Sequence, residues 1–222
     1  MKLISKILSP NKEVVYLTFQ PENKVEFKAG QFMMLDNWEI KRAYSIASSP
    51  LDNNLSFYIK KASENGMSKY FVEDINVWDE ISSIWPFGHM ILEENETTNY
   101  LLVSVWSGLG PILSIYRTFL KSWKYNKLVN IFGERYEDTI VKDILEELSI
   151  NNEKTKNIIH LSREEKEWFE TWYVQESFAD AVKFLWEDTV VYMCWKPSMV
   201  DESVEKLIDL WIKKENIKFE KF

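Results

Sequence analysis

Arg42-Ala43-Tyr44-Ser45-Ile46-Ala47-Ser48 gathers a cation, an aromatic ring and several hydroxyl groups just after the apolar run Phe32-Met33-Met34-Leu35. Because side chains alternate between the two faces of an extended strand, Arg42 and Tyr44 project from the same face. A guanidinium suits a pyrophosphate, and a phenol ring suits the flat isoalloxazine of a flavin. The stretch therefore predicts a flavin nucleotide site, and an ordinary amphipathic strand is the alternative.

Two further motifs follow in the first half of the chain. The apolar strand predicted over residues 55–60 runs into Glu64-Asn65-Gly66-Met67-Ser68, a turn that precedes a predicted helix. Backbone N–H groups at such a turn are suited to hold phosphate. Pro86-Phe87-Gly88 comes next and ends the strand-rich part of the sequence.

The second half carries two motifs that each follow an apolar strand. Residues 100–105 lead into Ser107-Gly108-Leu109-Gly110-Pro111, the setting of a dinucleotide-binding turn that opens a helix. Val190-Val191-Tyr192-Met193-Cys194 leads into Lys196-Pro197-Ser198-Met199-Val200. A glycine pair alone is a weak signal, so the order of the motifs along the chain supports the interpretation more than any one of them.

In this order the motifs resemble those of the ferredoxin–NADP reductase superfamily, whose flavin signature is Arg-x-Tyr-Ser. Residues 66–68 resemble its Gly-x-Ser turn, residues 86–88 the end of its flavin barrel, and residues 194–199 its Cys-Gly-x-Pro-x-Met segment. The resemblance implies that FAD and NADPH, or NADH, are bound by Arg42, Ala43, Tyr44, Ser45, Tyr58, Ile59, Lys60, Gly66, Met67, Ser68, Ser107, Gly108, Gly110, Pro111, Ser162, Arg163, Tyr173, Gln175, Cys194, Pro197, Met199 and Phe222.

The resemblance also implies roles near the reacting atoms. Ser45 is expected to hydrogen-bond near flavin N5, and Cys194 to lie beside nicotinamide C4. The ending Glu220-Lys221-Phe222 is similar to that of plastid-type members, which implies Glu220 as a proton relay and Phe222 stacked on the outer flavin face. The alternatives are a buried structural thiol for Cys194 and a surface strand end for the last residues.

Coenzyme choice is the next implication. Ser162-Arg163, after the strand predicted at residues 157–161, and Tyr173-Val174-Gln175 resemble the pocket that clasps the 2′-phosphate of NADPH and stacks its adenine. Arginine suits a phosphate, and the sequence therefore favours NADPH. Some NADH users carry a similar Ser-Arg pair, so NADH stays open.

The distribution of turn residues and apolar segments along the sequence predicts two domains. Turns rich in Pro, Asn and Asp separate short strands up to about Leu92, whereas apolar strands alternate with helical patterns from Tyr100 onward. With the resemblance, this predicts an antiparallel six-stranded FAD-binding β-barrel over residues 1–94 and a Rossmann-like parallel α/β NAD(P)-binding domain over residues 95–222, with the polar run 93–99 as the linker.

Composition narrows the classes of function. Cys194 is the single cysteine, so neither a disulfide nor a four-thiolate cluster forms within this chain, which argues against a fused ferredoxin domain and against the iron–sulfur subunit of dihydroorotate dehydrogenase. A net charge of −8 argues against nucleic acid as a partner. No 20-residue apolar span or signal peptide is present, so we expect a cytoplasmic protein, most simply a monomer, without a metal site.

The predicted function is hydride transfer from NAD(P)H to FAD, with single electrons passed on to a ferredoxin, flavodoxin or similar carrier. One alternative is an electron-transfer subunit of a larger redox complex. The other is a flavin-binding module with a disabled nicotinamide site, which Trp106 and Trp195 suggest.

Tryptophan stands where the family has glycine. Trp106 and Trp195 interrupt the two motifs of the second half, Trp85 precedes Pro86-Phe87-Gly88, and Trp78 falls in a Val-Gly-Asp setting. Six glycines in 222 residues are fewer than the usual share of roughly 7%, and adding the ten tryptophans restores it. We therefore hypothesise a gene that reads UGA as glycine, the alternative being a tryptophan-rich natural variant. Indoles at 106 and 195 are expected to occupy space meant for the dinucleotide. The other sites are Trp38, Trp123, Trp168, Trp172, Trp186 and Trp211.

Overall fold

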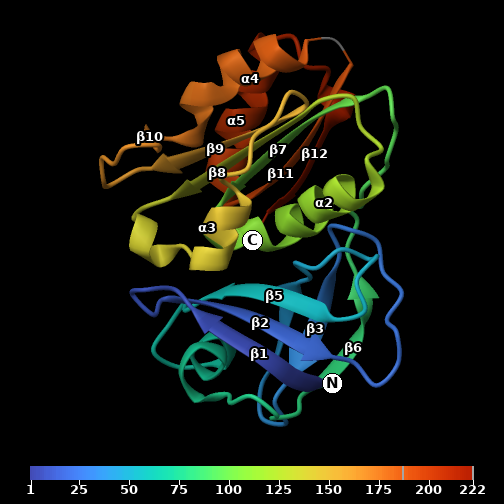
Figure 1. Ribbon diagram of the computed structural model, residues 1–222, viewed down its shortest axis with the longest axis vertical. Helices are drawn as coiled ribbons and strands as arrows, with labels where there is room; N and C mark the ends of the chain where they lie inside the picture. The colour runs from blue at the N-terminus through green and yellow to red at the C-terminus, as the bar shows by residue number, and fades with distance from the viewer. Residues whose placement is uncertain (187, 222) are drawn as a thin grey trace.

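The first part of the computed structural model, which describes residues 1–186 and 188–221, consists of two antiparallel sheets (Figure 1). Each sheet has three strands, in the orders β1-β2-β5 and β4-β3-β6. The strands are β1 (Lys2–Leu8), β2 (Val14–Gln20), β3 (Phe32–Asp36), β4 (Lys41–Ser45), β5 (Leu55–Lys60) and β6 (Ser82–Phe87). Their inward side chains, among them Leu17, Leu35 and Phe57, are fully buried in one apolar cluster.

The predicted six-stranded barrel is corrected to two sheets. In the described residues, isolated β-bridges join the edges of the two sheets. They pair Lys2 with Glu80 and Ile46 with Phe57. The β1–β2 and β3–β6 ladders each contain a register shift. Such irregularities increase local twist and interrupt pairing, so the hydrogen-bonded ladders do not run continuously around the barrel.

A short helical segment crosses between β5 and β6. Helix α1 (Met67–Lys69) continues directly into the π-helical turn η1 (Tyr70–Asp74). Met67 and Phe71 are buried in the apolar cluster of the first part. These two side chains hold the segment, and with it the turn at Gly66, against the sheets.

The second part is a six-stranded sheet in which every pair of neighbours is parallel. Its order is β10-β9-β8-β7-β11-β12. The strands are β7 (Asn99–Val105), β8 (Leu128–Glu134), β9 (Thr155–Leu161), β10 (Glu170–Thr171), β11 (Thr189–Trp195) and β12 (Ile217–Lys221). The prediction of a parallel α/β arrangement is confirmed.

Helices cover both faces of this sheet (Figure 1). Helices α2 (Leu109–Ser122) and α3 (Lys142–Glu147) pack on one face, and α4 (Phe178–Leu185) and α5 (Pro197–Asp209) on the other. Short 3-10 turns complete the part: η2 (Trp106–Gly108), η3 (Glu137–Thr139), η4 (Val174–Ser177) and η5 (Lys214–Asn216). Burial on both faces explains why β7 and β8 are almost entirely buried along their length. Within the described residues, no helix is both long and apolar enough to span a bilayer.

The strand order reverses at β7. The chain runs outward through β8, β9 and β10, then returns to the other side of β7 with β11 and β12. In open α/β sheets the crevice at such a switch point, at the carboxyl ends of the strands, is where ligands bind. The segments that begin this crevice are η2 after β7 and Lys196 after β11.

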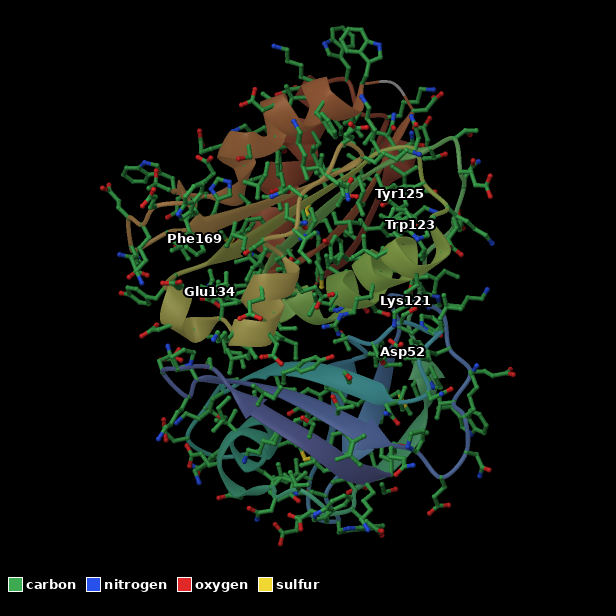
Figure 2. The ribbon with its side chains drawn as sticks, viewed as in Figure 1. Asp52, Lys121, Trp123, Tyr125, Glu134 and Phe169 are labelled. Carbon is green, nitrogen blue, oxygen red and sulfur yellow. The ribbon has the colours of Figure 1, made fainter. Side chains whose placement is uncertain are left out.

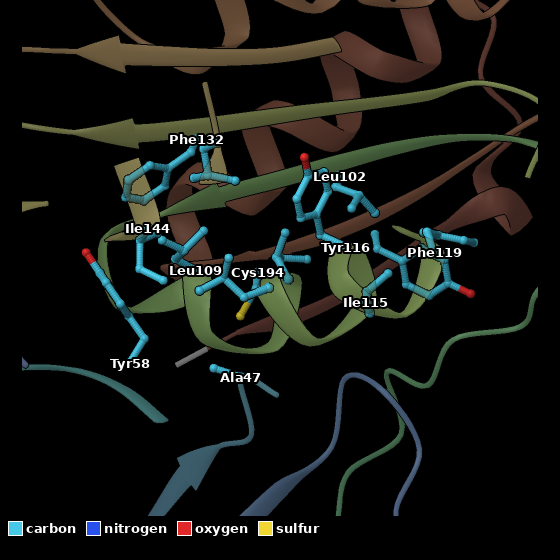
Figure 3. Packing of buried hydrophobic residues seen from close by; sticks show 14 of the residues in the cluster. Ala47, Tyr58, Leu102, Leu109, Ile115, Tyr116, Phe119, Phe132, Ile144 and Cys194 are labelled. Atoms are coloured by element: carbon cyan, nitrogen blue, oxygen red, sulfur yellow. The ribbon is translucent and has the colours of Figure 1, made fainter. Parts of the chain in front are cut away.

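Helix α2 joins the two parts. Ala47 and Tyr58 from the antiparallel part share an apolar cluster with Leu109, Ile115 and Cys194 of the parallel part (Figure 3). The two parts therefore have a common core.

Polar contacts reinforce this junction. Arg117 of α2 donates to the Tyr16 hydroxyl at 2.6 Å and to the Ala47 carbonyl at 2.9 Å, while its Nε and Nη2 bind the Glu147 carboxylate at 2.9 and 2.6 Å. Lys121, at the far end of α2, pairs with Asp52 (Figure 2).

Replacing the Arg117 guanidinium is predicted to destabilise the fold. In Arg117→Met the apolar stem is kept, but Glu147 loses its partner, so the free energy of unfolding in urea is expected to fall by about 1.5–3 kcal/mol. Lys142→Met is the control, because its partner Glu146 is 67% exposed and 3.7 Å away, and there we expect a change within about 0.5 kcal/mol. Equal losses in the two variants would contradict the role given to Arg117.

Candidate functional site

The first predicted motif lines a cavity of about 490 Å³ beside β4, β5 and the turn before α1. Predicted residues that the structure brings together there are Arg42, Ala43, Tyr44, Ser45, Tyr58, Ile59, Lys60, Gly66, Met67, Ser68, Ser107 and Glu220. Four further residues that the sequence did not predict also line it: Phe32, Ala62, Ser63 and Asn65. Phe32 pairs with Ser45 in the β3–β4 ladder, so only the strand register could have found it.

Arg42 and Tyr44 project to the same side of β4, as alternation requires. Arg42 is exposed, and its Nη1 donates to the Lys41 carbonyl at 2.8 Å. The Tyr44 ring meets Phe71 edge-on, with centroids 5.2 Å apart. Burial raises the pKa of Tyr44 to about 12, against the opposing effect of Arg42. The phenol therefore stays neutral near pH 7 and is able to donate a hydrogen bond.

The turn before α1 depends on glycine. Gly66 has φ 110° and ψ −174°, a conformation that is essentially restricted to glycine. Ser68 accepts a hydrogen bond from the Ala62 N–H at 3.1 Å, which closes the turn. The start of α1 is thereby held at the cavity wall.

Close approach of backbones sets the geometry where α2 begins. A Cβ added at Gly108 would lie 2.2 Å from the Cys194 carbonyl oxygen, and one added at Gly110 would lie 3.5 Å from Ser45 Cβ. Ser45, the start of α2 and the end of β11 therefore meet, although Gly108, Gly110, Pro111 and Cys194 do not line the cavity itself.

Cys194 and Glu220 are neighbours in the β11–β12 ladder. Cys194 is fully buried, and burial, reinforced by the Glu220 charge, raises the pKa of its thiol well above the usual value. Burial also raises the pKa of Glu220, with His89 opposing. The Glu220 Oε2 atom is buried with no hydrogen-bond partner in residues 1–186 and 188–221. A carboxyl of this kind retains a proton more readily than an exposed one. Phe222 lies outside the described residues.

A buried ion pair links the two parts beside the cavity. Lys60 Nζ lies 3.0 Å from Oε1 of Glu134, whose side chain has no exposed surface. Burial raises the pKa of Glu134, and the charge of Lys60 partly offsets this. The same Oε1 accepts the Arg135 N–H at 2.8 Å.

Three cations surround the Trp106 ring at the switch point. Lys196 Nζ, Arg135 Cζ and Lys60 Nζ lie 4.4, 4.6 and 5.4 Å from its centroid. Arg135 and Lys196 were not predicted from the sequence; each directly follows a parallel strand, and that position is the one signal that could have found them.

The predicted 2′-phosphate residues lie at a second, smaller hollow. Ser162 and Arg163 line it with Glu164, Glu165 and Trp172, and its volume is about 190 Å³. Glu164 is engaged by the Glu137 N–H at 2.9 Å and by Lys166 at 3.2 Å.

The remaining predicted residues line neither hollow. Tyr173 is 55% exposed, and Gln175 follows it in η4 with a buried Oε1 that lacks a partner in the described part of the chain. Pro197 and Met199 begin α5.

Trp195 is placed differently from the expectation. Alternation along β11 directs Cys194 toward α2 and Trp195 toward α4 and α5, where its ring is 3% exposed in an apolar cluster. The expectation that this indole stands in the path of a dinucleotide is corrected, because the ring is core. Trp106, by contrast, lies in η2 just after β7 and is only partly buried.

Comparison with known proteins agrees with this geometry. The family model for the oxidoreductase NAD-binding domain matches residues 102–205. The naphthalene 1,2-dioxygenase system ferredoxin–NAD(P)(+) reductase component of Pseudomonas putida is 31% identical over 60% of this chain and 40% of its own length. Ferredoxin–NADP reductase B of Sorangium cellulosum is 29% identical over 64% of this chain and 60% of its own length. The chain is therefore similar to ferredoxin–NAD(P) reductases and shares their NAD-binding domain.

A solved member of the superfamily has the same fold. The ferredoxin NADP+ reductase of Neisseria gonorrhoeae, solved with bound FAD and NADP, superposes with a TM-score of 0.80 at 19% identity, covering 100% of this chain and 98% of that one. The two relatives named above are longer than this chain, which spans 40% and 60% of their lengths.

Burial of Glu134 predicts a pH-dependent cost to stability. Because its pKa is raised in the folded protein, the folded state binds this proton more tightly than the unfolded chain does. The stability that the protonated form contributes is then fully present below pH 4.5, the ordinary pKa of this carboxyl, and is lost as the pH rises through the higher pKa of the folded state. Relative to Glu134→Gln, the parent protein is expected to lose free energy of unfolding between pH 4.5 and neutrality, measured in urea.

Glu13→Gln is the matched control, because the Glu13 carboxylate is 4.0 Å from the same Lys60 but 56% exposed. A pH profile for Glu134→Gln parallel to that of the parent would contradict the assignment. The same divergence in Glu13→Gln would assign it to Lys60 instead.

Proposed function

We propose that this chain is an FAD-dependent oxidoreductase that takes hydride from NADPH or NADH and passes single electrons to a ferredoxin, flavodoxin or similar redox carrier. The observation that supports it most is the cavity in which Arg42, Tyr44, Ser45, the turn at Gly66 and Glu220 converge. In this proposal residues 1–94 form the FAD-binding domain and residues 95–222 the NAD(P)-binding domain.

The chemistry of the cavity fits FAD. Its wall combines an exposed guanidinium and a helix start, which suit a diphosphate, with the half-buried Tyr44 ring, which suits a flat heterocycle. The Glu220 Oε2 atom is buried without a partner in the described part of the chain, and Glu220 lines the cavity. Buried polar groups are usually satisfied, so this atom supports a polar ligand here.

Bound FAD would supply the change from two-electron donor to one-electron acceptor. The residues of the chain then bind and orient. Arg42 and the N–H groups that follow Gly66 hold the diphosphate, and the Tyr44 ring lies against the isoalloxazine. Ser45 donates or accepts a hydrogen bond at the ring edge, and Glu220, whose pKa is raised by burial, holds a proton at its carboxyl.

The dinucleotide is proposed to cross the carboxyl ends of the parallel strands. Gly108 lets the start of α2 approach Cys194, and Gly110 lies beside Ser45, which brings the two ligand sites together. Arg163 and Ser162 bind the 2′-phosphate at the smaller hollow, and Tyr173 covers the adenine.

A second candidate role is that of a reductase component within a multi-protein redox system. The relative from Pseudomonas putida carries that description in its name. Stable copurification with an oxygenase or hydrogenase partner would favour this role over a free-standing reductase.

The flavin assignment predicts yellow protein from which FAD, not FMN, is released on denaturation. Arg42→Ala removes charge-assisted hydrogen bonds to the diphosphate and is expected to weaken FAD binding by about 1.5–3 kcal/mol, measured by fluorescence on titrating apoprotein. Lys41→Ala is the control, since this neighbouring cation pairs with Asp36 at 3.4 Å. Release of FMN, or equal weakening in both variants, would refute the assignment.

The coenzyme assignment predicts a selective effect of Arg163. Arg163→Ala is expected to raise the KM for NADPH and spare that for NADH, because the lost contact is to the 2′-phosphate and is equal in ground and transition states. Lys166→Ala is the control, as this cation is already engaged by Glu164 at 3.2 Å. Steady-state diaphorase kinetics measure both; parallel losses with the two coenzymes would assign Arg163 to the fold.

A further inference from the structure

Most of the tryptophans have a backbone conformation that tryptophan rarely adopts. Among the described residues only ten non-glycine residues have positive φ, and apart from Lys12 and Asp188 all of them are tryptophan. They are Trp38, Trp78, Trp106, Trp123, Trp168, Trp172, Trp186 and Trp211, with φ between 53° and 84°. Positive φ is uncommon outside glycine and is an outlier for bulky side chains. Trp85 and Trp195 lie within β6 and β11 and do not share it.

Two of these positions are typical glycine sites at helix ends. Trp123 follows α2 with φ 59° and ψ 19°, the left-handed conformation that glycine supplies after many helices. Trp186 follows α4 with φ 64° and ψ −134°, where a side chain is still less tolerated. The backbone at both helix ends is therefore built for glycine.

Packing does not compensate for this conformation. Trp168 and Trp211 are each 92% exposed, and Trp123 is 62% exposed. Strained residues persist where the surrounding structure holds them in place, whereas Trp168 and Trp211 are almost fully exposed and the Trp123 ring has Tyr125 as its aromatic neighbour. The indoles therefore contribute little at the positions they occupy.

Trp106 differs from the others in its surroundings. Its ring lies among Lys60, Arg135 and Lys196 at the switch point between β7 and β11. These three positive charges repel one another. In the described part of the chain, the carboxylates that form ion pairs with the three cations are Glu134 and Glu13, and both pair with Lys60. An anionic ligand in the place of the ring would neutralise the three cations.

We propose that these eight positions are glycine in the functional protein, and that Lys60, Arg135 and Lys196 bind a phosphate-bearing ligand in the space that the Trp106 ring fills. The second statement rests on the function proposed above. The first is independent of function, because it follows from φ and exposure alone. A gene in which UGA encodes glycine, translated as if UGA encoded tryptophan, would produce this chain.

The identity of the residues is tested at the level of the gene and the native protein. We expect UGA codons at all eight positions, and peptides from the source organism whose masses require glycine there. UGG codons, or native peptides that contain tryptophan, would overturn the first statement whatever the protein binds.

The site is tested with FAD-loaded full-length protein in three forms: the tryptophan chain, Trp106→Gly and Trp123→Gly. Trp123 is a matched control, because it has nearly the same φ but stacks on Tyr125 at 6.2 Å beyond the other end of α2 (Figure 2). Both variants are expected to raise the Tm. Only Trp106→Gly is expected to bind NADP+ and inorganic pyrophosphate more tightly, by about tenfold, the effect of one charge-assisted hydrogen bond.

Calorimetric titration separates the outcomes. Adding Lys196→Ala to Trp106→Gly is expected to reverse the gain in pyrophosphate binding. If the tryptophan chain binds NADP+ as tightly as Trp106→Gly, the site assignment is wrong while the proposed function stands. If Trp106→Gly retains FAD but binds neither probe, both the site assignment and the coenzyme part of the proposed function fail. Trp106→Ala, which also removes the ring, serves as a second variant should the glycine protein not fold.

Discussion

The close seating of α2 between the two parts is the constraint on which the rest of the structure depends. Gly108, immediately before the helix, has no room for a Cβ against the Cys194 carbonyl, and Gly110 in its first turn lies in contact distance of Ser45. Further along, Arg117 ties the same helix to Tyr16 and Glu147. Because one rigid helix makes all these contacts, the cavity beside β4 and the carboxyl ends of the parallel strands are held at a fixed separation.

Charge at this junction is arranged around buried groups. The Glu134 carboxylate is removed from water and is held by Lys60 and by the Arg135 N–H. Lys60 belongs to the antiparallel part and Glu134 to the parallel part, so a ligand anion that attracted Lys60 would compete with the link between them. In the proposed enzyme, coenzyme binding and the contact between domains would therefore share one side chain.

The physical reason for glycine, and the cost of replacing it, differ from one position to another. At Gly66 the backbone conformation itself requires glycine, and at Gly108 the nearby carbonyl does. At Trp123 the conformation is the one that glycine supplies, but the indole projects into solvent and the fold accommodates it. This is why eight tryptophans in left-handed conformations are compatible with the fold, while the proposed effect on ligand binding concerns Trp106 at the switch point.

The sequence by itself determined the local features. Alternation placed Arg42 and Tyr44 on one face, and apolar strands alternating with helical patterns specified the parallel sheet, because each of these patterns lies in neighbouring residues. The order of the motifs along the chain carried the resemblance to the ferredoxin–NADP reductase superfamily. Tertiary structure alone decided that Lys60, Arg135 and Lys196 converge on Trp106, that Phe32 joins the cavity, that Trp195 faces the core, and that the barrel strands divide into two sheets. These features depend on strand order, register and pairing between segments far apart in the chain, where parallel strands bring their carboxyl ends to one edge, and no local pattern encodes them.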